Sequence, residues 1–369
     1  MLGCRACTWG GSIVTNAATF AEKLLGWWDD HGRHDLPWQQ NTTAYSVWVS
    51  EIMLQQTQVA TAERYYNRFL TSFPDVAALA AASADDVLHH WSGLGYYSRA
   101  RNLHKAAKLV VEQHAGELPA SLDELVALPG IGPSTAGAIL SLACQQRQPI
   151  LDGNVKRVLA RLYAIEGWSG STANMKVLWE LAEQCTPHER VANYTQAIMD
   201  MGATLCTRSK PACELCPMQT DCQAFTLDRV SAIPAPKPKK AKPQRSAIVV
   251  MACNVAGDVL LEKRPPTGIW GGLWSFPELG SLDEVDSWCT VQLGVEPASR
   301  QTWADVSHSF SHFDFAMTPV RLALETTPAA VMEGERWLWY NARSPAGIGL
   351  AAPVAKLLQQ LHSKNGVEE

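Results

Sequence analysis

Apolar residues recur every three to four positions along the chain as far as residue 230, a spacing that is typical of amphipathic helices. After residue 245 the pattern changes to short runs rich in β-branched and aromatic residues, which predict strands. We therefore predict a mainly α N-terminal part joined to a smaller α+β part. The predicted helices are 20–31, 44–57, 60–73, 84–91, 100–114, 122–128, 133–144 and 151–163, and the predicted strands are 247–253, 259–262, 316–324 and 336–340.

A segment rich in proline and lysine separates the two parts. Residues 233–245 read IPAPKPKKAKPQR and are too polar to be buried. Segments of this composition are extended and semi-rigid, so the sequence predicts a linker here. Residues 1–19 are expected to form an N-terminal extension, in preference to a ligand motif built on Cys4 and Cys7.

Composition excludes membrane and secreted classes. The 369 residues are enough for two full cores, and 47% of them are hydrophobic. No apolar run approaches the ~18–20 residues that a membrane-spanning helix needs. The first residues lack the layout of a signal peptide, and ten cysteines without such a leader indicate a reducing compartment. We therefore expect a cytoplasmic protein.

The charge distribution matters more than the net charge. A net charge of −5 at first argues against a nucleic-acid partner, but residues 246–369 alone hold −6 and the remainder +1. Basic residues cluster at 99–108, 156–161 and 237–245. Local patches decide whether a protein binds phosphates, although any single patch is also compatible with a solvated helix face.

Four cysteines form the run C-x6-C-x2-C-x5-C, which predicts one metal centre within a short loop. The residues are Cys206, Cys213, Cys216 and Cys222. Structural zinc usually has two Cys-x2–4-Cys pairs separated by a longer stretch. This run has one such pair flanked by single cysteines, a spacing that favours a [4Fe–4S] cluster over zinc.

Residues 121–144 have the signature of a helix–hairpin–helix. Gly130 and Gly132 permit a tight turn with positive φ, and Pro133 suits the first position of the second helix. Such a turn presents backbone N–H groups at a helix N-terminus, where a DNA phosphate is favoured without sequence readout. The alternative is an ordinary helical hairpin.

Asp152 precedes another amphipathic helix, with Gly153 and Asn154 at its start. An aspartate in this place is commonly an N-cap, which contributes roughly 0.5–2 kcal/mol. A cap and a catalytic carboxylate are compatible roles, because a helix N-terminus also favours the ionised form.

The order of these motifs resembles the endonuclease III superfamily of DNA glycosylases. The segments VSEIMLQQTQV (49–59) and GLGYYSRARNL (93–103) are similar to those of its adenine-specific mismatch branch, the MutY type. The resemblance starts near Phe20 and extends into the C-terminal part. It implies a helical glycosylase domain over 20–205, a cluster loop over 206–222 and a Nudix-like domain over 246–362.

The resemblance also implies catalytic residues. Excision of adenine requires a protonated acid and an anion beside an oxocarbenium-like sugar, as in glycoside hydrolysis. Glu51 and Asp152 match these positions. Glu51 lies in an apolar stretch that would raise its pKa, so it is expected to protonate adenine N7 and then activate water. Asp152 would stabilise the cation, and Asn154 would orient a carboxylate. Without the resemblance, Glu51 would be interpreted as a solvated helix residue.

One position indicates that the strand is not cut. Bifunctional relatives carry a lysine where this chain has Ser134, and that lysine attacks sugar C1′ as a Schiff-base nucleophile. Serine cannot form an imine, so we expect a monofunctional glycosylase without strong AP-lyase activity. Lys156 is close enough in sequence for adventitious trapping only.

Contacts to DNA are implied at several positions. Gln56 and Tyr96 match residues that enter the duplex when the base is extruded, although packing is the alternative role for either. Arg99 and Arg101 would contact phosphates. The full set of expected DNA-binding residues is Gln56, Tyr96, Arg99, Gly130, Gly132, Ser134 and Lys156.

The C-terminal part resembles a Nudix domain that has lost its metal site. Residues 268–278 are similar to the start of a Nudix motif, but Val291 and Gln292 occupy the positions of the Mg²⁺-binding glutamates. Pyrophosphatase activity is therefore not expected. In the family this fold recognises 8-oxoguanine, and residues 307–312 match its recognition loop. The loop would place Phe310, Ser311 and His312 at the damaged base, in preference to a metal site on His308 and His312.

Together these features predict a monofunctional adenine DNA glycosylase that acts on adenine opposite 8-oxoguanine or guanine and initiates base-excision repair. The expected partner is double-stranded DNA with such a mispair, bound by a monomer associated with the nucleoid. The linker is a candidate docking segment for repair proteins. Ser134 disfavours a glycosylase/lyase and the recognition loop disfavours a thymine-mismatch enzyme. Glu51 and Asp152 disfavour a non-catalytic damage sensor, and the missing glutamates disfavour a Nudix hydrolase.

Overall fold

The computed structural model describes residues 17–239, 241–326, 328, 336–342, 344–345 and 347–365. The greater part of the predicted N-terminal extension, with Cys4 and Cys7, lies outside these residues. Contacts divide the described chain into two compact units. The first unit takes the residues up to Ile52 and Leu118–Pro238, and the second takes Met53–Glu117 and the residues from Lys239 onwards. These units do not follow the predicted domains, whose boundaries stay a prediction.

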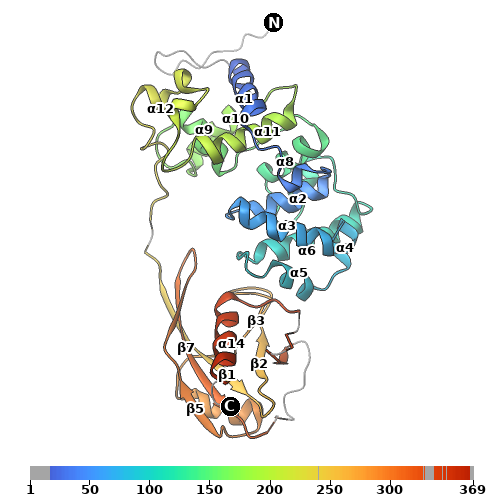
Figure 1. Cartoon of the computed structure of the whole chain (residues 1–369), viewed down its shortest axis with the longest axis vertical. Helices are drawn as coiled ribbons and strands as arrows, with labels where there is room; N and C mark the ends of the chain where they lie inside the picture. Colours follow the sequence, from blue (N-terminus) through green and yellow to red (C-terminus); the bar gives the residue numbers. More distant parts are fainter. Residues whose placement is uncertain are drawn as a thin grey trace. The chain divides into compact units, whose positions relative to one another are not determined.

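The first unit is helical. Its core forms where α1, α9, α10 and α11 pack against one another (Figure 1). Phe20, Leu24, Leu159 and Leu178 are fully buried there. The helices are α1 (Ala17–His31), α2 (Ala44–Leu54, which ends just inside the second unit), α7 (Leu122–Ala127), α8 (Pro133–Cys144), α9 (Gly153–Leu162), α10 (Thr172–Cys185), α11 (Val191–Asp200) and α12 (Gln223–Thr226), with short turns η1 (Pro37–Gln39), η2 (Met201–Leu205), η3 (Cys213–Leu215) and η4 (Gln219–Asp221).

The second unit begins with four helices. These are α3 (Val59–Ser72), α4 (Val76–Ala81), α5 (Ala84–Trp91) and α6 (Ser98–Gln113). Asp75 and Ser83 cap α4 and α5 by accepting backbone N–H groups, which defines where each helix starts. Phe69 and Trp91 are fully buried and meet edge to face, with ring centroids 6.0 Å apart.

The same unit contains a mixed β-sheet in the order β3-β2-β1-β7-β5, with β4 on β1, β6 on β7 and β8 on β2. β1 and β7 pair in parallel and the other pairs are antiparallel. The elements are β1 (Gln244–Cys253), β2 (Val259–Lys263), β3 (Trp274–Ser275), β4 (Glu278–Leu279), β5 (Ser299–Thr302), β6 (Val306–Ser309), β7 (Asp314–Ala323), β8 (Trp337–Tyr340), α13 (Glu284–Trp288), η5 (Cys289–Leu293) and α14 (Ala352–Asn365). Val250, Leu260, Val285 and Val320 form its core.

The fold class is as predicted, a helical N-terminal part and an α+β C-terminal part. α5 and α8 have the predicted bounds, because Ser83 and Pro133 mark their starts. Helix α2 ends at Leu54 rather than at residue 57. The prediction did not include α4, α10, α11, α12, α13 and α14. None of the described helices is long and apolar enough to cross a membrane.

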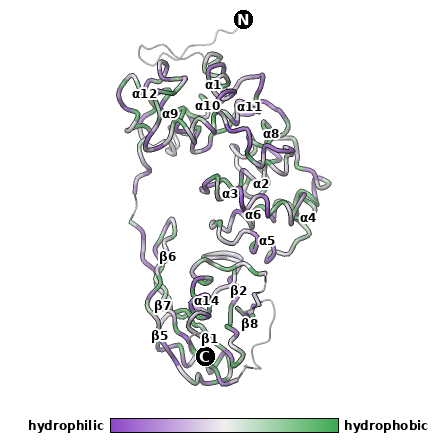
Figure 2. The backbone as a smooth tube through the Cα atoms, in the orientation of Figure 1, coloured by the Kyte–Doolittle hydropathy of each residue, from purple (hydrophilic) through white to green (hydrophobic). Residues whose placement is uncertain are grey.

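The linker is hydrophilic (Figure 2), and each of its ends is hydrogen-bonded to the unit it belongs to. Ile233 O accepts from buried Arg161 Nε at 2.9 Å, and Ala235 N–H donates to Gly167 O at 2.9 Å. At the other end, β1 starts at Gln244, three residues earlier than predicted, so the last linker residues pair with β7.

Candidate functional site

Glu51 and Asp152 come close enough in the first unit for their charges to interact. Desolvation raises the pKa of Glu51 to about 8, and the charge of Asp152 adds to this shift. Burial also raises the pKa of Asp152, but here backbone hydrogen bonds and the charges of Arg157 and Lys156 act in the opposite direction. Glu51 therefore keeps its proton at neutral pH, and Asp152 is the member of the pair whose ionised form is supported by its neighbours.

Asp152 is the N-cap of α9, as the sequence predicted. Its Oδ1 accepts the Val155 N–H at 2.8 Å. The residue before it is held by α8, because the Leu151 N–H donates to Ser134 Oγ at 3.0 Å. Ser134, where bifunctional relatives have lysine, therefore lies beside the candidate catalytic aspartate.

Asn154 is tied to the cysteine loop through Arg157. The Arg157 guanidinium donates to Asn154 Oδ1 at 2.8 Å, to Gly202 O at 2.6 Å and to Cys206 O at 2.8 Å. A Cβ on Gly202 would lie 2.5 Å from Asn154 Cβ, so only glycine allows this close approach. The first turn of α9 is thus fixed from two sides.

A cavity that the sequence analysis did not predict lies against α2 in the same unit. Its volume is about 280 Å³, and its lining includes Trp38, Gln39, Gln196 and Val47. Val47 lies four residues before Glu51, so the two residues share a face of the helix. Ser50, the residue before Glu51, belongs to the same lining, so an aromatic ring and two amide side chains lie against the stretch of α2 that carries the candidate acid. No sequence motif predicts that Gln196 lines this cavity.

The helix–hairpin–helix is formed by α7 and α8. Gly130 has φ +83°, but Gly132 is extended at φ −95° and is the N-cap of α8, so only one glycine needs the left-handed conformation. Both glycines are exposed, whereas Ile131 between them is buried and anchors the turn. Nothing lies within 4 Å of a Cβ built on Gly132, which leaves its surroundings open to a ligand.

The four cysteines of the predicted cluster loop line one small cavity in the first unit, together with Arg161. Arg161 is buried, and its guanidinium donates to Cys206 Sγ at 3.3 Å and to Thr207 O at 2.7 Å. Burial raises the pKa of Cys216 to about 11, so thiolates here require positive charge nearby. Within the described residues, no group of three or more His, Cys, Asp or Glu side chains is arranged to hold a metal ion.

Gln56 and Tyr96 are exposed residues of the second unit with left-handed backbones, at φ +59° and +48°. Arg99, which was expected to contact a phosphate, is only 8% exposed. Its guanidinium donates to backbone carbonyls on both sides, among them Gln55 O at 2.6 Å and Gly95 O at 3.1 Å. This placement argues against a phosphate contact by Arg99.

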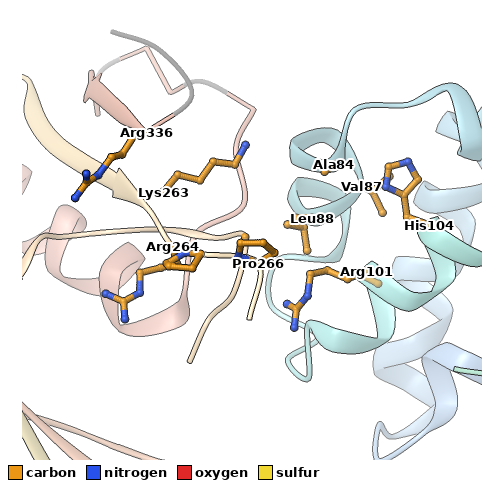
Figure 3. A pocket seen from close by; sticks show the side chains of 12 residues that line it. Ala84, Val87, Leu88, Arg101, His104, Lys263, Arg264, Pro266 and Arg336 are labelled. Atoms are coloured by element: carbon orange, nitrogen blue, oxygen red, sulfur yellow. The ribbon is translucent and has the colours of Figure 1, made fainter. Parts of the chain in front are cut away.

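Arg101 is also occupied within the protein. Its Nη1 donates to Gly271 O at 2.7 Å. Figure 3 shows Arg101 of α6 extending towards the loop that carries Pro266, across a cavity of about 540 Å³. Arg101 is half-buried and this bond engages one of its nitrogens, so the expected phosphate contact by Arg101 stays a prediction.

The predicted recognition loop is the turn between β6 and β7. Phe310 stacks on Phe313 with centroids 4.5 Å apart and also contacts the Trp270 ring, whereas Ser311 and His312 are exposed. The three loop residues line a cavity of about 620 Å³, and Tyr96 contributes to the same lining. Tyr96, one of the two residues expected to enter the duplex, therefore shares a cavity with the recognition loop.

Two family models match the chain. Residues 49–201 match the HhH-GPD superfamily of base excision DNA repair proteins, and residues 248–360 match the NUDIX domain. The first match includes Glu51, Asp152 and the hairpin. The second includes the recognition loop.

Curated relatives match over most of the chain. Adenine DNA glycosylase of Buchnera aphidicola subsp. Acyrthosiphon pisum is 38% identical over 92% of this chain and 97% of its own length. Adenine DNA glycosylase of Mus musculus is 36% identical over 92% of this chain and 78% of its own length.

Solved structures reproduce the helical part. A thermostable thymine-DNA glycosylase has a TM-score of 0.51 and 26% identity, and covers 57% of this chain and 97% of its own. Endonuclease III in a non-covalent DNA complex has a TM-score of 0.51 at 19% identity, and covers 59% of this chain and 99% of its own, which shows the fold alone.

Proposed function

The chain belongs to the adenine DNA glycosylases of the HhH-GPD superfamily, and we propose that it removes adenine paired with 8-oxoguanine or guanine without cutting the strand. Removal of adenine in base-excision repair is the activity of this family. The observation that carries the catalytic assignment is the Glu51–Asp152 pair, in which one carboxyl group has a pKa of about 8.

The extruded adenine would occupy the cavity against α2, the helix that carries Glu51. Trp38 offers a ring for stacking, and Gln39 and Gln196 offer amides for the edge of the base. Glu51, protonated at neutral pH, would donate its proton to N7, because adenine leaves poorly as an anion. Glu51 would then accept a proton from the attacking water.

Asp152 would stabilise the positive charge that develops on the sugar. Backbone hydrogen bonds from Val155 and Asn154 and the charge of Arg157 support its ionised form. Asn154 would act mainly by holding this turn, since its side chain is bonded to Arg157.

The absence of strong AP-lyase activity would follow from Ser134. Its hydroxyl is engaged with the Leu151 N–H and offers no amine at the sugar. Lys156 lies on the first turn of α9, where its charge supports Asp152.

A [4Fe–4S] cluster would be held by Cys206, Cys213, Cys216 and Cys222, and bound there it would order the loop that follows η2. The shared cavity supports a common centre for the four thiolates, and the C-x6-C-x2-C-x5-C spacing favours a cluster over a zinc ion. Arg161 and Arg157 hold the same loop through Cys206.

Recognition of the opposite base would lie with Phe310, Ser311 and His312. The cavity that they share with Tyr96 supports this assignment, because the partner of an extruded adenine is the base that both groups would reach. The exposed hairpin at Gly130 and Gly132 would contact the phosphate backbone.

We propose that the enzyme works as a monomer on nucleoid DNA in the cytoplasm. The linker offers hydrophilic residues between its two bonded ends, where a repair partner could dock.

The test uses an end-labelled duplex with adenine opposite 8-oxoguanine. The duplex is incubated with anaerobically purified protein, and the reaction is divided before quenching so that breakage is compared with and without alkali. Strand breakage only after alkali is expected, because base loss leaves an alkali-labile site. Breakage without alkali would contradict the monofunctional assignment. Tight binding without breakage would contradict the roles of Glu51 and Asp152.

A further inference from the structure

Two exposed side chains in the second unit are held on strained backbones. Gln56 follows the end of α2 at φ +59°, and Tyr96, which is 47% exposed, precedes α6 at φ +48°. Non-glycine residues seldom adopt this conformation, and it persists where the surroundings enforce it. Both residues therefore need a neighbour that fixes their loops.

Arg99 supplies that contact on the α2 side. Its Nη1 donates to Met53 O at 2.9 Å and to Gln55 O at 2.6 Å, and both terminal nitrogens lie 3.3 Å from Thr57 Oγ1. These acceptors surround Gln56 and include carbonyl groups that a helix end leaves unsatisfied.

The same guanidinium also holds the loop before α6. Its Nη2 donates to Leu94 O at 3.2 Å and to Gly95 O at 3.1 Å. The guanidinium carbon lies 5.3 Å from the centre of the Trp91 ring and 5.6 Å from that of Tyr96. Although burial lowers the pKa of Arg99 to about 10, the group stays charged at neutral pH.

We propose that Arg99 is a positioning residue that holds Gln56 and Tyr96 as one rigid wedge for entry into the duplex. The inference rests on the proposed function and on the resemblance described above, which implies that these two side chains enter the duplex when the adenine is extruded. A flexible pair would have to be ordered during each extrusion, whereas a pre-organised pair would not.

A double-mutant cycle tests this role. Arg99→Lys keeps the charge, but an ammonium cannot span acceptors on both loops as a planar guanidinium does. We expect Arg99→Lys to lower single-turnover excision, measured below saturating enzyme, by about tenfold. In the background of Gln56→Ala with Tyr96→Ala, the same substitution should cause no further loss. A 2-aminopurine beside the mispair should also show a smaller fluorescence rise on binding.

The matched control is Arg68→Lys, because Arg68 is an exposed arginine that donates to the His90 carbonyl at 2.7 Å in the same unit. It should behave as the wild type. If circular dichroism shows that Arg99→Lys does not fold, Thr57→Val, which removes one acceptor of the guanidinium, replaces it in the cycle. Equal losses in both backgrounds, or no loss in either, would overturn the proposal. A wild-type protein that leaves adenine in place would refute the proposed function. The 2-aminopurine fluorescence of the same set of variants, measured on binding, would still decide the role of Arg99.

Discussion

The Leu151 backbone N–H donates a hydrogen bond to Ser134 Oγ at 3.0 Å, which joins the first turn of α8 to the residue that precedes Asp152. The hairpin is proposed to contact a phosphate, and the Asp152 carboxyl group is proposed to face the sugar. One hydrogen bond and one peptide unit therefore separate these two parts of the site. A side chain at position 134 is thus held close to Asp152.

This relationship predicts the result of Ser134→Lys. The new amine would lie beside Asp152, close to where the sugar is proposed to bind, and could form an imine after the base has left. We expect borohydride to trap a covalent complex that the wild type gives only weakly. Loss of the hydroxyl acceptor should lower the free energy of unfolding by about 1 kcal/mol. Ser134→Ala is the control, with the same loss of stability and no trapping.

The pKa of Glu51 predicts the alkaline limb of the pH–rate profile. A carboxyl group with a pKa of about 8 is protonated below that pH and ionised above it. If it is the acid, the single-turnover rate should be level between neutral pH and pH 8 and fall towards tenfold per pH unit above it. Glu51→Gln should be slow at every pH and should lack this limb. A wild-type rate that is unchanged between pH 7 and about 9.5 would refute the assignment.

The same shift predicts how stability depends on pH. In the unfolded chain Glu51 loses its proton near the ordinary value of 4.5, but in the folded state it keeps the proton up to about pH 8. Between these values the folded state binds one proton more, so this group makes stability fall as pH rises. Glu51→Gln removes the penalty and should raise the free energy of unfolding above pH 8 by a few kcal/mol. Chemical denaturation at pH 5 and 8.5 measures this, and an equal effect at both would contradict it.

The sequence predicted local features better than contacts between distant residues. Pro133 and Ser83 mark helix starts by themselves, and Asp152 was recognised as a cap from the helix behind it. The predicted extension of α2 to residue 57 was wrong because the chain turns at Gln56, whose positive φ depends on its tertiary contacts.

In the candidate site, too, local features were predicted from the sequence and contacts between distant residues were not. The resemblance, together with the apolar neighbours of Glu51 in the sequence, predicted its raised pKa. The inward placement of Arg99 could not be predicted, because its acceptors at Met53, near the end of α2, and at Leu94, in the loop before α6, are more than 40 residues apart. An arginine in a basic run is usually solvated, and only the folded arrangement shows otherwise. The position of Gln196 in the cavity beside α2 could not be predicted for the same reason.

The contacts of Arg161 predict that this residue stabilises the cysteine loop. Its buried guanidinium bonds Cys206 Sγ, Thr207 O and the linker carbonyl of Ile233, which an ammonium cannot do together. We expect Arg161→Lys to lower the iron content per chain and to cost about 2–4 kcal/mol of stability, because buried acceptors lose their donors. The exposed Arg229→Lys, which affects only an ion pair with Glu166, is the control. Full iron content in Arg161→Lys would contradict this role.

A substitution in the recognition loop is expected to change the preference for the base opposite adenine rather than catalysis. Lys242 donates to Ser309 Oγ at 2.9 Å and to Phe310 O at 2.6 Å, so the turn is held from the linker side while Ser311 points to solvent. If Ser311 contacts 8-oxoguanine, Ser311→Ala should reduce binding to the 8-oxoguanine mispair by roughly tenfold and leave the guanine mispair unchanged, since the lost hydrogen bond exists only with the damaged base. The exposed Val291→Ala serves as the control for the domain. Equal weakening of both mispairs would mean that the loop binds the backbone and not the base.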